Sequence, residues 1–327
     1  MPSTVHRIFR VLVASLALLA AVHARDTLAQ AYPVKPITLV YLSAAGSVVD
    51  AALRVASVEA SKVLGQPIVI EYRPGAGGRV AITMVAAAPP DGYMLATISN
   101  SSVVMGRLTS ASFKLDPGRD YAPAFLMYQN GLILTSHPDL PFRDFRGFLE
   151  YAKANPGRIN YSSTGVGSLS HVGFERIIAA TGIVATHVPY KGEQDSTLDR
   201  LKGTISVSLG ALVKPNVEAG QLIGLATTGS RRMLTLPNLP TLQEAGLSGF
   251  TSTSWFGVAA PAATPAAIIS RLNSVFNAVF TAPGFGKRLE SIGAEIVTET
   301  PEEFTNRIKL ELAGYAPIVS KLGLTVD

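Results

Sequence analysis

The chain has 327 residues, a length that ordinarily holds two domains. Lys and Arg together number 28 and Asp and Glu 23, and this excess is too small to indicate a nucleic-acid-binding protein. Hydrophobic residues make up 47% and charged residues 16%, a balance that excludes intrinsic disorder. Cysteine is absent, which excludes disulfides, thiolate nucleophiles and zinc–cysteine sites.

The N-terminus has the features of a secretory signal peptide. Arg7 and Arg10 precede an apolar run over residues 11–22, shorter than the about 20 residues that span a membrane. Two candidate cleavage sites with the small-x-small pattern follow this run. One ends at Ala24, and the other, which matches Ala-x-Ala better, ends at Ala31. We expect residues 1–31 to be removed after Ala31 and the mature chain to be periplasmic; an uncleaved interfacial anchor is the alternative.

Short apolar strands alternate with amphipathic helices along the mature chain. This alternation predicts an α/β fold of mainly parallel sheets with helices on both faces, divided into two lobes around a cleft. We expect strands at 37–42, 67–71, 94–98, 132–135, 159–163, 185–189, 205–209, 223–228 and 254–259. We expect helices at 49–64, 79–88, 145–154, 170–181, 195–202, 265–280 and 301–322.

The motifs of common enzyme classes are missing from the sequence. It contains no Gly-x-Ser-x-Gly, no Ser-x-x-Lys and no His-Glu-x-x-His. His137, His171 and His187 are scattered and lack the spacing of metal ligands. We therefore predict no catalytic residues, no metal and no cofactor.

Two glycine-rich stretches resemble nucleotide-binding loops only in part. Residues 73–78 lack the Gly-Lys-Ser/Thr that ends a phosphate loop, so a tight strand-to-helix turn is the favoured interpretation. Residues 165–170 follow a strand and open a helix, as a dinucleotide fingerprint does. Their third glycine is replaced by serine, and no acidic residue ends the next strand.

Three polar loops follow predicted strands and open predicted helices. N–H groups and hydroxyls at such positions form anion sites, and ligands of α/β sheets bind at these strand ends. The sequence therefore predicts that facing lobes clamp a small carboxylate; helix capping is the alternative for each loop. The candidate residues are Ser43, Gly46, Ser47 and Asp50 in the first loop (43–50), Ser99 and Asn100 in the second loop (99–102), and Ser163, Thr164, Gly165, Gly167, Ser168 and His171 in the third loop (162–171).

Three of the polar residues carry more than one interpretation. Asp50 favours a helix dipole but would repel a carboxylate, so as a binder it would accept from a ligand amine or hydroxyl or from a bridging water. His171 is more readily a structural histidine than a ligand contact. Tyr190 is a further candidate contact at a strand end, and Lys191 is either the one cation near the cleft or a solvated lysine.

Several longer motifs resemble one family over essentially the whole mature chain. They are Glu71–Gly78, Ala88–Tyr93, Tyr151–Gly157, His187–Gly192, Leu239–Gly246 and Ser254–Gly257. Through them the sequence resembles the Bug receptors, which are TctC-like extracytoplasmic solute-binding proteins of tripartite tricarboxylate transporters.

This resemblance implies a two-lobed periplasmic binding fold of type II. The first lobe would comprise 32–131 plus 253–327 and the second 132–252. The implied function is a monomeric receptor, not an enzyme, that binds a small organic acid and delivers it to transporter membrane subunits. The alternatives are docking on the periplasmic domain of a sensor kinase and, least favoured, an exported enzyme on the same scaffold.

The sequence also departs from the family pattern. The family's first loop is Pro-Phe-x-Pro-Gly-Gly-x-x-Asp; here Asp50 and Gly46 remain, and both prolines and one glycine are lost. Ser206 and Ser208 stand where an aspartate is common, which favours a ligand without an amine. The third loop is retained, so we expect Ser163–Ser168 to hold the ligand carboxylate.

Overall fold

The computed structural model describes residues 32–46, 48–190, 192–211, 213–291 and 294–325. The predicted signal peptide, Ser47 and Lys191 lie outside these ranges.

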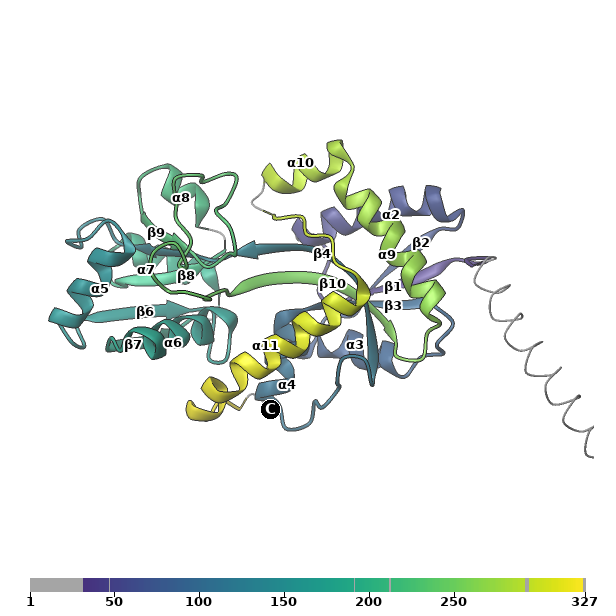
Figure 1. The fold of residues 1–327 in the computed structure, drawn as a ribbon, viewed down its shortest axis with the longest axis horizontal. Coiled ribbons are helices and arrows are strands. Elements are labelled where there is room, and N and C mark those ends of the chain that lie inside the picture. Colours follow the sequence, from purple (N-terminus) through teal and green to yellow (C-terminus); the bar gives the residue numbers. More distant parts are fainter. Residues whose placement is uncertain (1–31, 47, 191, 212, 292–293, 326–327) are drawn as a thin grey trace, which may run out of the picture.

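In the described ranges ten strands form two five-stranded sheets, each the centre of one lobe (Figure 1). The first-lobe sheet has the order β2 (Ile68–Tyr72), β1 (Ile37–Tyr41), β3 (Met94–Ser99), β10 (Thr253–Pro261) and β4 (Tyr121–Gly131). The second-lobe sheet has the order β7 (Ala185–Pro189), β6 (Ile159–Ser163), β8 (Val207–Gly210), β5 (Ile133–Ser136) and β9 (Ile223–Thr227). The chain crosses into the second lobe where β4 passes into β5, and it crosses back between β9 and β10. These two segments, which lie side by side, are called the crossings below. The predicted two-lobed α/β class is confirmed.

The sheets are mixed, which corrects the expectation of mainly parallel sheets. Each sheet has two parallel and two antiparallel pairings. The antiparallel pairs all involve β4, β5 or β10, the strands next to the crossings. Because β4 leaves the first lobe and β10 returns to it, the two strands run in opposite directions.

Strand β4 was not predicted, although it is the longest of the sheets. It contains Pro123, and proline within an apolar run argues against a strand in the middle of a sheet. The structure tolerates Pro123 because β4 is the edge strand of the first-lobe sheet, where one side of the backbone has no neighbouring strand to bond.

Helices cover both faces of the first-lobe sheet. Along β1, Ile37, Leu39 and Tyr41 belong to one core, and Val40 belongs to the other. This alternation is what the two-residue period of a strand requires when both faces are buried. The first core is built with α2 (Val48–Leu64), α9 (Ala266–Thr281) and α10 (Pro283–Ser291), and the second with α3 (Arg79–Ala86) and α11 (Pro301–Lys321).

The second core continues without interruption into the second lobe. There it includes α5 (Phe145–Ala154) and α6 (Leu169–Thr181), while α7 (Glu193–Leu201) and α8 (Lys214–Glu218) lie at the other face. Helix α11 runs from the first lobe toward the second and packs on both β4 and α6 (Figure 1). The lobes therefore share apolar contacts under α11.

The start of α11 is well defined by its sequence. Thr300 and Glu303 form a reciprocal capping box, and Pro301 occupies the first turn, where its missing N–H is harmless. Phe304 then packs over β10 at Gly257. A Cβ at Gly257 would lie 2.5 Å from the Phe304 ring and 2.8 Å from the backbone oxygen of Phe125.

Replacing Gly257 with alanine is expected to lower the free energy of unfolding by about 1–3 kcal/mol, because the ring and the strand must move apart. Urea denaturation measures this change. Gly314→Ala is the matched control, since Gly314 lies on the exposed side of α11 with no atom near an added Cβ. It should gain up to about 1 kcal/mol in helix propensity. An unchanged denaturation midpoint for Gly257→Ala would contradict this packing.

Candidate ligand-binding site

The three polar loops lie at strand ends, as predicted. The first loop joins β1 to α2 and the second joins β3 to a π-helix, η2 (Asn100–Met105). Since β1 and β3 are adjacent parallel strands, these two loops are neighbours at one edge of the first-lobe sheet. The third loop joins β6 to α6 in the second lobe, next to Tyr190 at the end of β7.

The first loop is organised around Asp50. This buried carboxylate accepts hydrogen bonds from the Gly46 N–H at 2.9 Å, the Tyr72 hydroxyl at 2.8 Å and Arg54 Nε at 3.1 Å. Burial alone would raise the pKa of Asp50, but these bonds and the Arg54 charge hold it below its ordinary value. The Asp50 carboxylate is therefore occupied by hydrogen bonds within the protein and stabilises the conformation of the loop. Ser43 is half-buried and Gly46 is exposed.

The second loop connects the candidate site to the crossing between the lobes. Ser99 and Ser102 form a capping box at the start of η2. Asn100 is completely buried, and its Nδ2 donates to the backbone oxygen of Thr253, the first residue of β10, at 2.8 Å. Its Oδ1 has no partner among the described residues. A π-helix is rare and often marks a functional site.

The third loop bonds many of its own hydroxyls. Ser168 caps α6 by accepting from the His171 N–H at 3.3 Å, and the Gly167 N–H donates to Nδ1 of His171 at 3.1 Å. The exposed Thr164 donates its N–H to the Ser170 hydroxyl at 3.1 Å. Gly165 and Gly167 have φ values of 127° and 76°, which explains why glycine is found at both positions.

Three backbone N–H groups of the third loop and the start of α6 are available to a ligand. Among the described residues, the N–H groups of Val166, Leu169 and Ser170 have no hydrogen-bond partner. The N–H groups of the first helical turn point out of the helix end and carry the positive end of its dipole. The start of α6 can therefore accept an anion without a charged side chain in the loop.

A pair of stacked histidines packs against the inner side of the third loop. The rings of His171 and His187 lie 3.8 Å apart and nearly parallel, and Nε2 of His187 is 2.7 Å from the Ser163 hydroxyl. Burial lowers the pKa of His171, and burial together with His171 lowers the pKa of His187 to about 4. Both rings are therefore neutral at pH 7, and the structure places His171 inside the lobe.

Tyr190 is adjacent to the third loop but is held by α7. Its N–H donates to the Ser163 backbone oxygen at 3.0 Å, and its hydroxyl donates to Asp199 at 2.8 Å. The glycine-rich stretch at 73–78 forms a turn in which an added Cβ at Gly78 would lie 3.1 Å from Ser102. This geometry supports the tight-turn interpretation of that stretch.

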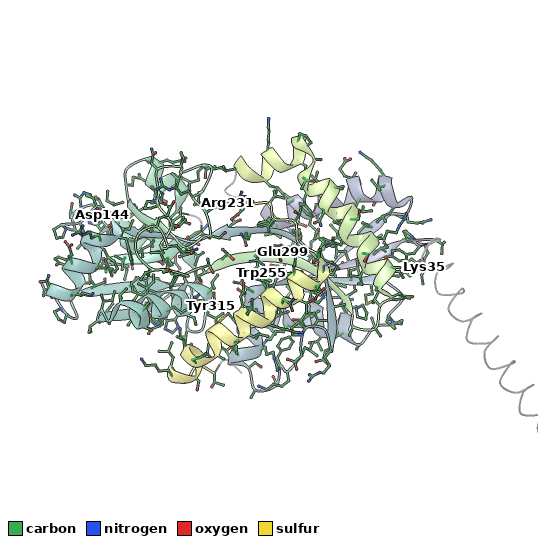
Figure 2. All side chains as sticks on the ribbon, in the orientation of Figure 1. Lys35, Asp144, Arg231, Trp255, Glu299 and Tyr315 are labelled. Atoms are coloured by element: carbon green, nitrogen blue, oxygen red, sulfur yellow. The ribbon has the colours of Figure 1, made fainter. Side chains whose placement is uncertain are left out.

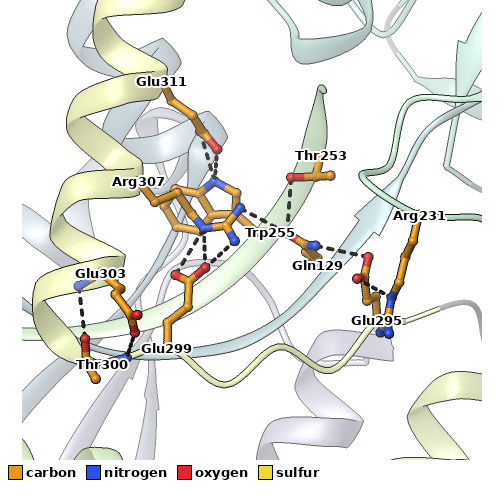
Figure 3. A network of polar contacts seen from close by, with 10 residues as sticks. All are labelled: Gln129, Arg231, Thr253, Trp255, Glu295, Glu299, Thr300, Glu303, Arg307 and Glu311. Atoms are coloured by element: carbon orange, nitrogen blue, oxygen red, sulfur yellow. Dashed lines mark hydrogen bonds and ion pairs between the residues drawn. The ribbon is translucent and has the colours of Figure 1, made fainter. Parts of the chain in front are cut away.

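A polar network lies at the crossing, and sequence reasoning missed it (Figure 3). Gln129, near the end of β4, accepts from Arg307 at 3.0 Å and donates to Glu295 at 3.0 Å. Glu295 also pairs at 2.5 Å with Arg231, which belongs to the return segment from the second lobe. These residues are far apart in the chain and share no local pattern, so only the fold brings them together.

The same network contains a carboxylate with an unusual environment. Trp255 on β10 donates its indole N–H to Glu311 on α11 at 2.9 Å (Figure 3). Arg307 pairs with Glu299, and a cavity of about 220 Å³ lies beside Glu311, Arg307 and Arg176. Residues of the three loops line neither this cavity nor the one of about 20 Å³ at Arg231.

No helix in the described ranges is both long and apolar enough to cross a membrane. No cluster of three or more His, Cys, Asp or Glu residues suited to a metal ion occurs there either.

Comparison with known proteins agrees with the two-lobed architecture. The model of the tripartite tricarboxylate transporter family receptor, TctC, matches residues 52–324. The chain belongs to this family. The resemblance to the Bug receptors is thereby confirmed.

Relatives match the chain over most of its length. A Cupriavidus necator protein named UPF0065 protein in gbd 5'region is 32% identical over 98% of both chains. Protein BugT of Bordetella pertussis is 28% identical over 90% of this chain and 91% of its own.

Two solved structures of similar proteins contain small carboxylates. Rpa4515 of Rhodopseudomonas palustris, with adipate, is 29% identical, covers 90% of this chain and 99% of its own, and superposes with a TM-score of 0.73. MatC of the same organism, with bound malate, is 27% identical, covers 88% and 100%, and has a TM-score of 0.69.

Glu311 gives a pH-dependent prediction. Burial raises the pKa of Glu311 from 4.5 to about 7, against the lowering effects of Trp255 and of Arg307 and Arg176. Its contribution to stability is therefore full below about pH 4 and is lost as the pH rises to 7. Glu311→Gln should remove this loss, so its stability relative to wild type should rise by about 2 kcal/mol between pH 5 and pH 8.

Urea denaturation at both pH values measures the change. Glu303→Gln, at the start of the same helix, is the control. Hydrogen bonds from Thr300 lower the pKa of Glu303 from 4.5, so its contribution to stability is lost only below about that pH, and its variant should change little relative to wild type between pH 5 and pH 8. A difference between Glu311→Gln and wild type that does not vary with pH would refute the assignment.

Proposed function

We propose that the protein is a periplasmic receptor that binds a small organic carboxylate between its lobes and delivers it to the membrane subunits of a tripartite transporter. The observation that carries the proposal is the start of α6. There the N–H groups of Val166, Leu169 and Ser170 have no partner among the described residues, and Ser168 adds a hydroxyl. Family members with adipate and malate support the same ligand class.

The carboxylate would be bound by neutral donors in this proposal. Asp50, the carboxylate of the first loop, is already bonded by Gly46, Tyr72 and Arg54, which neutralise its repulsion of an anion. His171 and His187 are neutral at pH 7 because their pKa values are lowered. Geometry and the helix dipole, and not an ion pair in the loop, would select the ligand.

The loops of the first lobe would complete the site. In this proposal Ser43, Gly46, Ser99 and Asn100 face the ligand from the first lobe when the lobes close by a hinge motion. Residues 32–131 plus 253–327 and residues 132–252 move as two bodies about the crossings. Asn100 is suited to couple binding to that motion, because it is bonded to the first residue of β10.

Binding itself is tested by thermal shift and calorimetry on refolded 32–327. The panel contains malate, adipate and other small carboxylates, with amino alcohols and sugars as controls. A bound acid at 100 times its dissociation constant should stabilise the protein by about 2.7 kcal/mol. Stabilisation by one of these controls and by no acid would overturn the proposal.

The third loop is tested by Ser168→Phe. The bulky ring should block the start of α6 and weaken carboxylate binding at least tenfold, about 1.4 kcal/mol, as measured by calorimetry. The variant also loses a helix cap, which costs about 1 kcal/mol of stability. Asp144→Ala is the matched control, because Asp144 caps α5 at the far end of the same lobe (Figure 2). It should lose similar stability and keep full affinity; equal affinity of both variants would exclude this loop.

A further inference from the structure

Arg200 on α7 is a completely buried arginine without a carboxylate partner. Its Nη2 donates to Oγ1 of Thr197 at 3.0 Å, and its Nε and Nη1 have no hydrogen-bond partner among the described residues. Burial lowers the pKa of Arg200 to about 10, which leaves the guanidinium charged at neutral pH.

Such a residue is costly for the fold. Buried charges in proteins are nearly always paired and hydrogen-bonded, because desolvation of an unpaired charge is strongly unfavourable. An apolar side chain of similar volume would fold at least as well. The presence of an arginine at this position is therefore explained more readily by function than by stability.

The position of the guanidinium is set by its contacts along α7. Thr197 lies one turn before Arg200, so the side chain is directed back toward the helix N-terminus. Ser196 on the same part of α7 is hydrogen-bonded at 2.8 Å to Ser162, the residue of β6 that precedes Ser163. Arg200 follows Ser196 by one turn of α7 and lies inside the second lobe, on the face of the sheet opposite α6.

The acidic side chains near Arg200 offset only part of the positive charge of its guanidinium. Glu193, at the start of α7, acts on it electrostatically, but no ion pair within 4 Å joins them in the described structure. Glu193 lies at the end of β8, where a Cβ at Gly210 would meet its carboxylate. Asp199 is bonded to Tyr190 and Lys202, Asp195 is exposed, and the histidines below the loop are neutral.

We propose that Arg200 determines the charge preference of the site: from the α7 face of the second-lobe sheet, its guanidinium attracts the ligand bound at the start of α6 and favours dianionic over monoanionic acids. This inference rests on the proposed function and assigns Arg200 no direct contact with the ligand. A buried charge acts through a medium of lower dielectric than water and is little screened by salt. The preference should therefore persist at high ionic strength.

The test compares adipate with hexanoate, six-carbon acids that differ by one carboxylate. Calorimetry on wild type should show the stronger binding for adipate. Arg200→Met should weaken adipate binding by about tenfold and hexanoate binding by less, while the protein stays at least as stable as wild type in urea. The adipate deficit should be the same at 0.05 and 0.5 M salt, buffer values chosen to span about 14 to 4 Å of Debye length.

Glu193→Gln is the matched control of opposite sign. Removing this acid should expose more of the Arg200 field and tighten adipate binding about threefold, whereas a merely structural role predicts weaker binding in both variants. Because Glu193 is only half-buried, the Glu193→Gln variant tests the inference even if Arg200→Met does not fold.

Unchanged adipate affinity in Glu193→Gln, or an unchanged adipate-to-hexanoate ratio in Arg200→Met, overturns the inference alone. A wild-type protein that binds no carboxylate overturns the proposed function and this inference with it.

Discussion

The antiparallel pairing of β4 with β10 is the constraint on which the two lobes depend. These strands carry the chain out of the first lobe and back into it, and their pairing extends from Tyr121–Pro261 to Gly131–Thr253. Polar side chains bridge the crossing, with Gln129 bonded to Arg307, Glu295 and Thr253. Helix α11 covers this junction and packs on both lobes, so any change in lobe orientation must involve these contacts.

The candidate site combines neutral hydrogen-bond donors at its surface with a charged guanidinium, that of Arg200, in the interior of the second lobe. The start of α6 offers N–H groups, and Asp50, the acid of the first loop, is ionised but hydrogen-bonded by its neighbours and paired with Arg54. In the proposed function such a surface would bind a carboxylate through geometry and would exclude few acids by charge. In our account Arg200 supplies the missing selectivity from the interior, where salt does not screen it.

Much of the fold was predictable because its elements are short and clearly bounded. Helix α5 and strands β6 and β7 have the predicted limits, since Pro and Gly end each apolar run. Strand β4 was missed because Pro123 is tolerated only at an edge, which the sequence does not reveal. The loops were found from local polarity, but the Gln129 network and the buried Arg200 depend on contacts between distant segments. Ligand contact at the predicted residues stays a prediction.

The most direct test of the central claim is a crystal structure of the protein with the carboxylate that it binds most tightly. Our account predicts a carboxylate oxygen within about 3 Å of the N–H groups at the start of α6, with the first and second loops on the opposite side of the ligand. A ligand bound instead in the cavity beside Arg176 and Glu311, with the start of α6 exposed to solvent, would contradict it.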